Sequence, residues 1–159
     1  MPLEIERRFL VSRDVQELCR EGQRIVQGYL PSAAGRTVRV RLAGAKGYLT
    51  MKGKRTGCVR SEREWEIPHD LAADVLSSRC RSTLIVKTRY QVEHAGNGWV
   101  IDVFDGANSG LIIAEIELDC PEQNVPLPDW VGREVTGDRR YGNSALAVHP
   151  VANWERRAA

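Results

Sequence analysis

The sequence lacks any long hydrophobic run, which excludes a membrane-spanning helix from the expected elements. Its longest apolar stretch, residues 111–114, is far shorter than the roughly 18 residues that such a helix requires. The first four residues, Met1-Pro2-Leu3-Glu4, become acidic at once and lack the apolar core of a secretion signal. We therefore expect neither insertion into a membrane nor export.

Cysteine and histidine are scarce, with four and three residues respectively. The cysteines are widely spaced and form no CxxC pair, so the sequence shows neither a zinc-site pattern nor a disulfide framework suited to its size. A reducing, cytoplasmic location is the simplest interpretation. Any bound metal is then expected to be held by oxygen ligands.

An excess of charge of one sign is also nearly absent, because the formal net charge is only +2 at pH 7. A value this small gives no reason to expect a nucleic-acid partner. The hydrophobic share of 42% and the charged share of 28% are typical of a globular protein. At roughly 150 residues per domain, the length predicts one domain.

Most of the sequence alternates apolar and polar residues with the period of two that indicates β-strands. Eight segments show this pattern: residues 3–11, 24–30, 36–43, 48–54, 59–67, 83–93, 99–105 and 111–119. The connections at residues 44–47 and 95–98 are short and rich in glycine, as in hairpins. The pattern predicts a mainly β (α+β) fold built on an antiparallel sheet of eight strands.

Two helices are expected to interrupt the strands, and a third to follow them. Asp14 and Glu17 resemble a capping box at the start of the first helix, and Asp70 can cap the second. Residues 143–148 form the third helical segment, which Pro150 ends. Residues 121–132 contain three prolines and are expected to form a loop.

The charged residues on the polar faces of these strands are grouped by sign. The cations are Arg8, Arg39, Arg41, Lys52, Lys87 and Arg89, and the carboxylates are Glu4, Glu6, Glu62, Glu64, Glu66, Asp102, Glu115 and Glu117. For any single strand, a solvated outer face is the simpler explanation. Like charges two positions apart nevertheless repel by about 0.6 kcal/mol in water, and a surface selected for solubility would mix the signs. Such grouping favours strands that face a shared interior, where cations and carboxylates compensate one another.

Eight strands can close a barrel whose interior holds side chains or one small ligand. We therefore expect an eight-stranded antiparallel closed β-barrel, or tunnel, with a polar lumen and a few covering helices. Six cations in the lumen suit a polyanion, since arginine forks match phosphate oxygens two at a time. The carboxylates can contribute if divalent cations lie between them and the phosphates, because Mg²⁺ and Mn²⁺ take oxygen ligands from both. The pattern indicates a site for a metal and a polyphosphate.

The segment Glu4-Ile5-Glu6-Arg7-Arg8 resembles the amino-terminal ExExK signature of the CYTH superfamily, the triphosphate tunnel metalloenzymes. Further blocks resemble the family pattern in the same order, at residues 27–30, 39–41, 49–52, 64–67, 87–90, 102–104, 115–118, 134–136 and 138–143. The resemblance extends to about residue 147, and the length is similar to that of small bacterial members. It implies one tunnel domain over residues 1–150, with residues 151–159 as a flexible tail or a cover of the tunnel mouth.

The resemblance also implies roles for individual residues. The expected ligands of Mg²⁺ or Mn²⁺ are Glu4, Glu6, Glu115 and Glu117. The expected phosphate-binding residues are Arg39, Arg41, Lys52, Lys87 and Arg89. Three more carboxylates are expected on the metal side or behind the metal ligands, namely Glu62, Glu64 and Asp102.

In small bacterial members a lysine at the end of the signature pairs with a tyrosine, so Arg8 and Tyr29 are the candidate catalytic residues. The sequence departs from the family pattern at Arg8. A guanidinium stays protonated in proteins and cannot act as a base. Arg8 can still hold an oxyanion, so the substitution bears on rate and on substrate choice.

The chemistry implied by the resemblance is metal-dependent hydrolysis of a triphosphate. Inorganic triphosphate, cleaved to diphosphate and phosphate, is the preferred substrate because no segment for a nucleobase is evident. The same fold hosts class IV-type adenylyl cyclases and thiamine or nucleoside triphosphatases, and fold alone does not choose among them. A non-catalytic polyphosphate-binding module and a solvated sheet without a ligand are the further alternatives.

The expected partner is therefore a small molecule that contains a triphosphate, with no nucleic acid and no membrane. Tyr141 and Asn143 are expected to lock the carboxyl-terminal segment to the barrel rather than to touch the substrate. Trp154, Arg156 and Arg157 are expected either to cover a mouth of the tunnel or to contact a second subunit in a homodimer. The sequence leaves both arrangements open.

Overall fold

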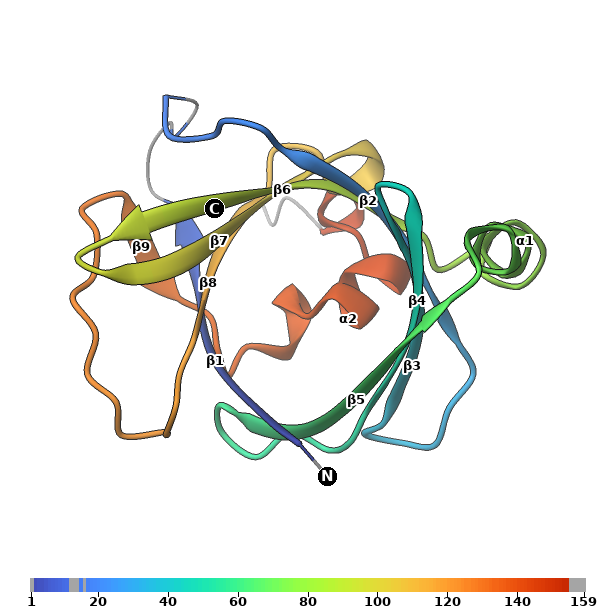
Figure 1. Cartoon of the computed structure of the whole chain (residues 1–159), viewed down its shortest axis with the longest axis horizontal. Helices are drawn as coiled ribbons and strands as arrows, with labels where there is room; N and C mark the ends of the chain where they lie inside the picture. Colours follow the sequence, from blue (N-terminus) through green and yellow to red (C-terminus); the bar gives the residue numbers. More distant parts are fainter. Residues whose placement is uncertain (1, 12–14, 16, 155–159) are drawn as a thin grey trace.

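The computed structural model describes residues 2–11, 15 and 17–154. These residues form nine strands: β1 (Leu3–Val11), β2 (Gln23–Leu30), β3 (Thr37–Ala43), β4 (Lys46–Lys52), β5 (Val59–Ile67), β6 (Ile85–His94), β7 (Asn97–Phe104), β8 (Ile112–Glu117) and β9 (Val131–Glu134). Eight of them, in the order β5-β4-β3-β2-β6-β7-β8-β1, form an antiparallel sheet that closes when β1 pairs with β5. Figure 1 shows this ring of strands end-on. The predicted closed eight-stranded barrel is confirmed.

Strand β1 pairs with three neighbours along its length. Residues 3–5 pair with β5, residues 6–10 with β8, and Phe9 and Val11 with β9, where the register shifts. Strand β9 was not expected, and the predicted loop over residues 121–132 is wrong at its end because β9 begins at Val131. Four residues are too few to show a clear period of two.

The helices lie on the outside and at one end of the barrel. Helix α1 (His69–Arg79) packs outside β3 and β4, and α2 (Asn143–Val148) lies across the ring of strands in Figure 1. Three short 3₁₀ turns accompany them: η1 (Gly106–Asn108), η2 (Arg139–Tyr141) and η3 (Val151–Asn153). The prediction that Asp70 caps α1 is wrong, because Pro68 is the N-cap and makes no side-chain cap bond. Asp70 lies in the first turn, where its charge favours the helix dipole. The helix expected at Asp14 lies partly outside the described residues.

Three apolar clusters hold these elements together. The largest packs on the outer face of β1, β7 and β8 around Trp99, whose ring contacts those of Phe9 and Trp130. A second lies between α1 and the sheet, where Ala72 and Leu76 pack on Val40. These outward apolar faces agree with the alternation that the sequence shows.

The third cluster corrects the expectation of a wholly polar lumen. The buried side chains of Ile85 and Ile113 pack with Leu146 of α2 and with Tyr141 at one end of the barrel. The ring of Trp154 meets that of Tyr141 edge-on, with centroids 5.1 Å apart. Helix α2 and its neighbours therefore form an apolar floor, and the polar cavity lies beside it. The five residues that follow Trp154 lie outside the described part of the chain.

Candidate active site

A cavity of about 720 Å³ lies inside the barrel. Most of the predicted site residues line it: Glu4, Glu6, Arg8, Tyr29, Arg39, Arg41, Lys52, Glu62, Glu64, Lys87, Arg89, Glu115 and Glu117. The remaining one, Asp102, is fully buried and accepts hydrogen bonds from Lys87 and Arg89. The period of two brings these residues together, because alternate side chains of a strand point to the same face of the sheet.

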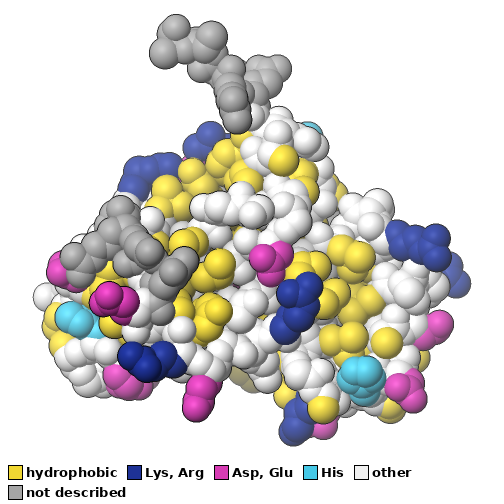
Figure 2. All heavy atoms as spheres, turned by 90° about the horizontal axis from the view of Figure 1, so that it is seen from above, with side chains coloured by type: hydrophobic (Ala, Val, Ile, Leu, Met, Phe, Trp, Pro, Cys, Tyr) yellow, Lys and Arg dark blue, Asp and Glu magenta, His cyan; other side chains and the backbone are white. Residues whose placement is uncertain are grey.

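One outer face of the molecule (Figure 2) has a different charge distribution. Figure 2 shows charged side chains of both signs scattered over one face of the molecule, with hydrophobic side chains exposed between them. On this face (Figure 2) the charges are not grouped by sign, whereas the charged residues that the strand pattern groups line the cavity.

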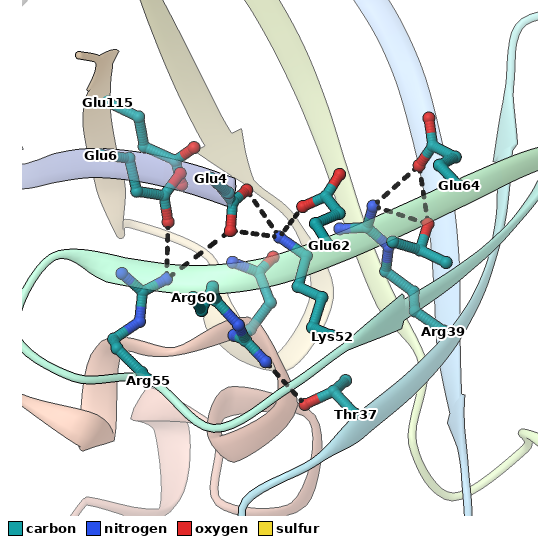
Figure 3. Close-up of polar contacts among 12 residues, drawn as sticks. Glu4, Glu6, Thr37, Arg39, Lys52, Arg55, Arg60, Glu62, Glu64 and Glu115 are labelled. Carbon is teal, nitrogen blue, oxygen red and sulfur yellow. Dashed lines mark hydrogen bonds and ion pairs between the residues drawn. The ribbon is translucent and has the colours of Figure 1, made fainter. Parts of the chain in front are cut away.

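Carboxylates from two adjacent strands meet on one wall of the cavity. In the antiparallel register of β1 and β8, Glu6 lies opposite Glu117 and Arg8 lies opposite Glu115. Figure 3 shows Glu4, Glu6 and Glu115 next to one another. Burial, and then the charge of Glu115, raise the pKa of Glu6. Burial opposes the ionisation of Glu115 as well, but the charge of Arg8 outweighs it and lowers the pKa of Glu115.

Lys52 and Arg55 compensate part of this negative charge. The Lys52 ammonium lies 2.7 and 2.9 Å from the two oxygens of Glu4 and 2.8 Å from Glu62. Arg55 donates to Glu6 at 2.9 Å (Figure 3). Burial and the neighbouring charge of Glu6 nevertheless raise the pKa of Glu4 to about 7. Burial opposes ionisation of Glu62 as well, but the hydrogen bond with Glu4 and the charge of Lys52 outweigh it and lower its pKa.

Cations on β6, close to the carboxylate wall, are anchored on Asp102 of β7, and Arg89 also lies 3.8 Å from Glu115. Arg89 donates two hydrogen bonds of 2.8 Å to this carboxylate, and Lys87 donates a third of 2.6 Å. The charges of Lys87 and Arg89 outweigh the burial of Asp102 and hold its pKa well below the usual range. Burial lowers the pKa of Lys87 to about 8, against the charge of Asp102. One carboxylate therefore holds two cations at the cavity wall.

Arg39 and Arg41 form a second basic pair, next to Glu64. Their Nη2 atoms each lie 3.2 Å from the same Glu64 oxygen. The Nε atoms of both arginines are buried and have no hydrogen-bond partner among the described residues. Burial and then the charge of Arg39 lower the pKa of Arg41. Two cations share one carboxylate, which leaves them in excess for an anionic ligand.

Among the described residues no hydrogen bond joins Arg8 to Tyr29, although the charge of Arg8 acts on the Tyr29 hydroxyl. Arg8 is buried, and it donates to Glu115 at 3.2 Å and to the backbone oxygen of Tyr141 at 2.6 Å. The Tyr29 hydroxyl accepts a hydrogen bond from Gln27 at 3.0 Å. Burial, partly offset by the charge of Arg39, raises the pKa of Tyr29, which keeps the hydroxyl protonated.

Three cations at or near the cavity were missed from the sequence, namely Arg55, Arg60 and Arg63. Arg60 lines the cavity on β5 and shares the face of Glu62 and Glu64, so the alternation itself could have identified it. Arg55 lies in the loop between β4 and β5, where no period applies, and only the structure brings it to Glu6.

Comparisons with known proteins agree with this geometry. A model of the CYTH domain matches residues 2–147 of this chain. The chain belongs to the CYTH domain family. The family resemblance read from the sequence is therefore confirmed.

Two curated relatives of this CYTH chain are named inorganic triphosphatase. The one from Acetivibrio thermocellus is 45% identical over 157 residues, which cover 98% of this chain and 99% of the relative. The one from Nitrosomonas europaea is 35% identical over 152 residues, covering 91% and 97%. The crystal structure of the inorganic triphosphatase NE1496 superimposes with a TM-score of 0.67 at 31% identity, covering 93% of this chain and 96% of that one.

The carboxylates of this CYTH barrel are suited to a hard divalent cation. In the described part of the chain, no three acidic, histidine or cysteine side chains form a ready-made metal cage. Mg²⁺ seldom needs one, because it is usually bound by one or two carboxylates together with substrate phosphates. Repulsion from neighbouring carboxylates contributes to the raised pKa of Glu4 and of Glu6, and a bound cation would relieve it. The donor set therefore fits Mg²⁺ or Mn²⁺ shared with a polyphosphate.

Proposed function

We propose that this protein is a divalent-metal-dependent triphosphatase that hydrolyses inorganic triphosphate to diphosphate and phosphate. The observation that carries the proposal is the cavity, which is lined by several carboxylates and several cations that pair with one another only in part. The names of the two curated relatives support the same activity, because they are similar to this chain over nearly its whole length.

The carboxylate wall would hold Mg²⁺ or Mn²⁺ through Glu4, Glu6, Glu115 and Glu117. Such a cation neutralises phosphate oxygens and lowers the pKa of bound water. Glu62 and Glu64 keep Lys52, Arg39 and Arg41 in place, and Asp102 does the same for Lys87 and Arg89. These three carboxylates therefore act behind the groups that bind the ligand.

The cations that line the cavity would bind the triphosphate and stabilise the leaving diphosphate. The residues are Arg39, Arg41, Lys52, Lys87 and Arg89, with Arg60 in addition. Donors that are fixed before the substrate arrives stabilise developing charge without reorganisation, which is how such sites accelerate phosphoryl transfer. The ion pairs with buried or half-buried carboxylates supply that fixation.

We assign to Arg8 the role of holding neighbouring groups in place, and not the role of a base. Its guanidinium stays charged and joins Glu115 on the metal side to the Tyr141 carbonyl at the floor of the cavity. Tyr29 keeps its proton and can donate a hydrogen bond to a phosphate oxygen. We assign the protein to a reducing compartment such as the cytoplasm, because the spacing of its four cysteines shows no disulfide framework. The structure contains no described helix that is long and apolar enough to cross a membrane.

The test is phosphate release from tripolyphosphate, ATP and diphosphate, with Mg²⁺, with Mn²⁺ and with EDTA. We expect turnover of tripolyphosphate above that of ATP, none in EDTA, and loss of the activity in Glu6→Gln with an unchanged circular dichroism spectrum. Cyclic AMP formation from ATP would assign a cyclase instead. Binding of tripolyphosphate without turnover in either metal would refute hydrolysis and assign a binding module.

A further inference from the structure

A chain of hydrogen bonds joins Tyr29 on β2 to Lys87 on β6 through two amide side chains. Gln27 Nε2 lies 3.0 Å from the Tyr29 hydroxyl oxygen and 3.1 Å from Asn143 Oδ1. Lys87 Nζ donates to the same Asn143 oxygen at 3.1 Å and to Asp102 at 2.6 Å. Gln27 is fully buried, and Asn143 is the first residue of α2. The chain thus crosses from the strands to the apolar floor.

The chemistry of Lys87 sets the direction of every bond in this chain. An ammonium has three donors and no acceptor, so Asn143 must present its oxygen to Lys87. The Gln27 atom that faces this oxygen must then be the amide nitrogen. An amide nitrogen donates and does not accept, so the Tyr29 oxygen accepts the other hydrogen bond from Gln27. This orientation leaves the Gln27 oxygen buried without a partner among the described residues.

The same constraints leave two protons for the cavity. Because the Tyr29 oxygen accepts from Gln27, its own proton must point elsewhere, and no described side chain takes it as an acceptor. Asn143 and Asp102 take two of the three Lys87 protons, and the ammonium also lies 5.5 Å from the centroid of the Phe104 ring, so the third proton has no hydrogen-bond acceptor among the described residues. Tyr29 and Lys87 both line the cavity. Each therefore has one donor available to a ligand there.

We propose that Gln27 and Asn143 are positioning residues that direct the Tyr29 hydroxyl and the Lys87 ammonium toward phosphate oxygens of the substrate. The inference rests on the proposed function and adds to it the residues that orient its donors. Asn143 links the floor of the cavity to both donors, so it does more than lock the carboxyl-terminal segment to the barrel. Gln27 and Asn143 act through the donors that they touch, and Asn143 itself also lines the cavity.

The test compares two variants that add the same charge but differ in hydrogen bonding. Gln27→Glu replaces a group with two N–H donors by one that has none when ionised, so the Tyr29 proton would turn toward it. We expect kcat for tripolyphosphate to fall about a hundredfold or more, as when a fixed donor is lost. Asn143→Asp keeps an acceptor for both Lys87 and Gln27. We expect its kcat to stay within about threefold while KM rises, because the added charge repels the substrate.

A double-mutant cycle separates positioning from general damage to the fold. In a Tyr29→Phe background no hydroxyl remains to be misdirected, so Gln27→Glu should lower kcat by no more than about threefold further. Gln27→Met, which removes both donors without adding a charge, gives the same cycle if Gln27→Glu fails to fold. Additive losses in the cycle, or equal losses of kcat in Gln27→Glu and Asn143→Asp, would refute the positioning role.

The wild-type protein distinguishes this inference from the proposed function. If the wild type binds tripolyphosphate without hydrolysing it, the proposed function fails. The double-mutant cycle can then still be measured, with the affinity for tripolyphosphate from calorimetry in place of kcat. Non-additive losses of affinity for Gln27→Glu and Tyr29→Phe would then support the orientation of the donors. Additive losses of affinity would reject it.

Discussion

Glu4 is expected to make the metal-free protein less stable as the pH rises from about 5 to 7. Its pKa is raised to about 7 by burial and by the charge of Glu6, whereas an unfolded chain releases this proton near 4.5. Between these values the folded state binds more protons than the unfolded state, so the free energy of unfolding falls as the pH rises. At a pH below about 4.5, Glu4 is protonated in both the folded and the unfolded state, so it does not lower the free energy of unfolding.

The size of the effect follows from the shift in pKa. At 1.36 kcal/mol per unit, the difference between 4.5 and about 7 corresponds to at most about 3 kcal/mol. For a chain of this length, that equals a fall in Tm of about 6–12 °C. The groups with lowered pKa, such as Glu62 and Asp102, lose their stabilising charge below this window. Lys87, with its pKa of about 8, titrates above it.

The assay is urea unfolding in EDTA at pH 5, 6 and 7, for the wild type and for Glu4→Gln. We expect the wild type to lose stability across this range and the variant to lose about 2–3 kcal/mol less, so that groups common to both cancel. Adding Mn²⁺ should stabilise the wild type more at pH 7 than at pH 5, because the carboxylate must lose its proton to bind the metal. Equal slopes for wild type and variant would show that Glu4 ionises normally and refute the reasoning.

Two further variants test the packing that supports the site. The lysine of Arg8→Lys cannot keep the hydrogen bonds to Glu115 and to the Tyr141 carbonyl in the same geometry. We therefore expect urea unfolding to show a loss of about 1–3 kcal/mol in stability. Unchanged stability would show that the bond to the Tyr141 carbonyl contributes nothing. Gly28→Ala places a methyl group into Cys80, so α1 must move and about 1–3 kcal/mol is lost. Gly137→Ala meets no heavy atom within 4 Å and is the matched control; equal Tm values for the two would contradict the overlap at Cys80.

The barrel and most of its lining could be predicted from the sequence because both depend on a local rule. Alternation over residues 3–11 and 59–67 matches the bounds of β1 and β5. It also places Arg39 and Arg41 on the face that carries Glu64 in the next strand but one. Like charges on one strand repel each other, but this repulsion is compensated when several strands bring opposite charges into the same cavity.

Features without a local period were not predictable in this way. Arg55 reaches Glu6 from a loop, and β9 is too short to alternate clearly. The bond between Gln27 and Asn143 joins positions that are 116 residues apart, and no pattern in either segment identifies its partner. The apolar floor depends on where α2 lies after the barrel has closed. The strand pattern alone does not indicate this position, and it therefore predicted polar side chains throughout the interior.

The way β1 completes the barrel has a consequence for folding. All three of its partner strands are distant in sequence, and its pairing with β5 involves only residues 3–5. Neighbouring hairpins such as β3–β4 and β6–β7 cost less loop-closure entropy and can form first, so β1 is expected to join late. Because Glu4 and Glu6 lie on that late strand, a metal ion bound there would prolong the lifetime of the folded protein and leave its rate of folding largely unchanged.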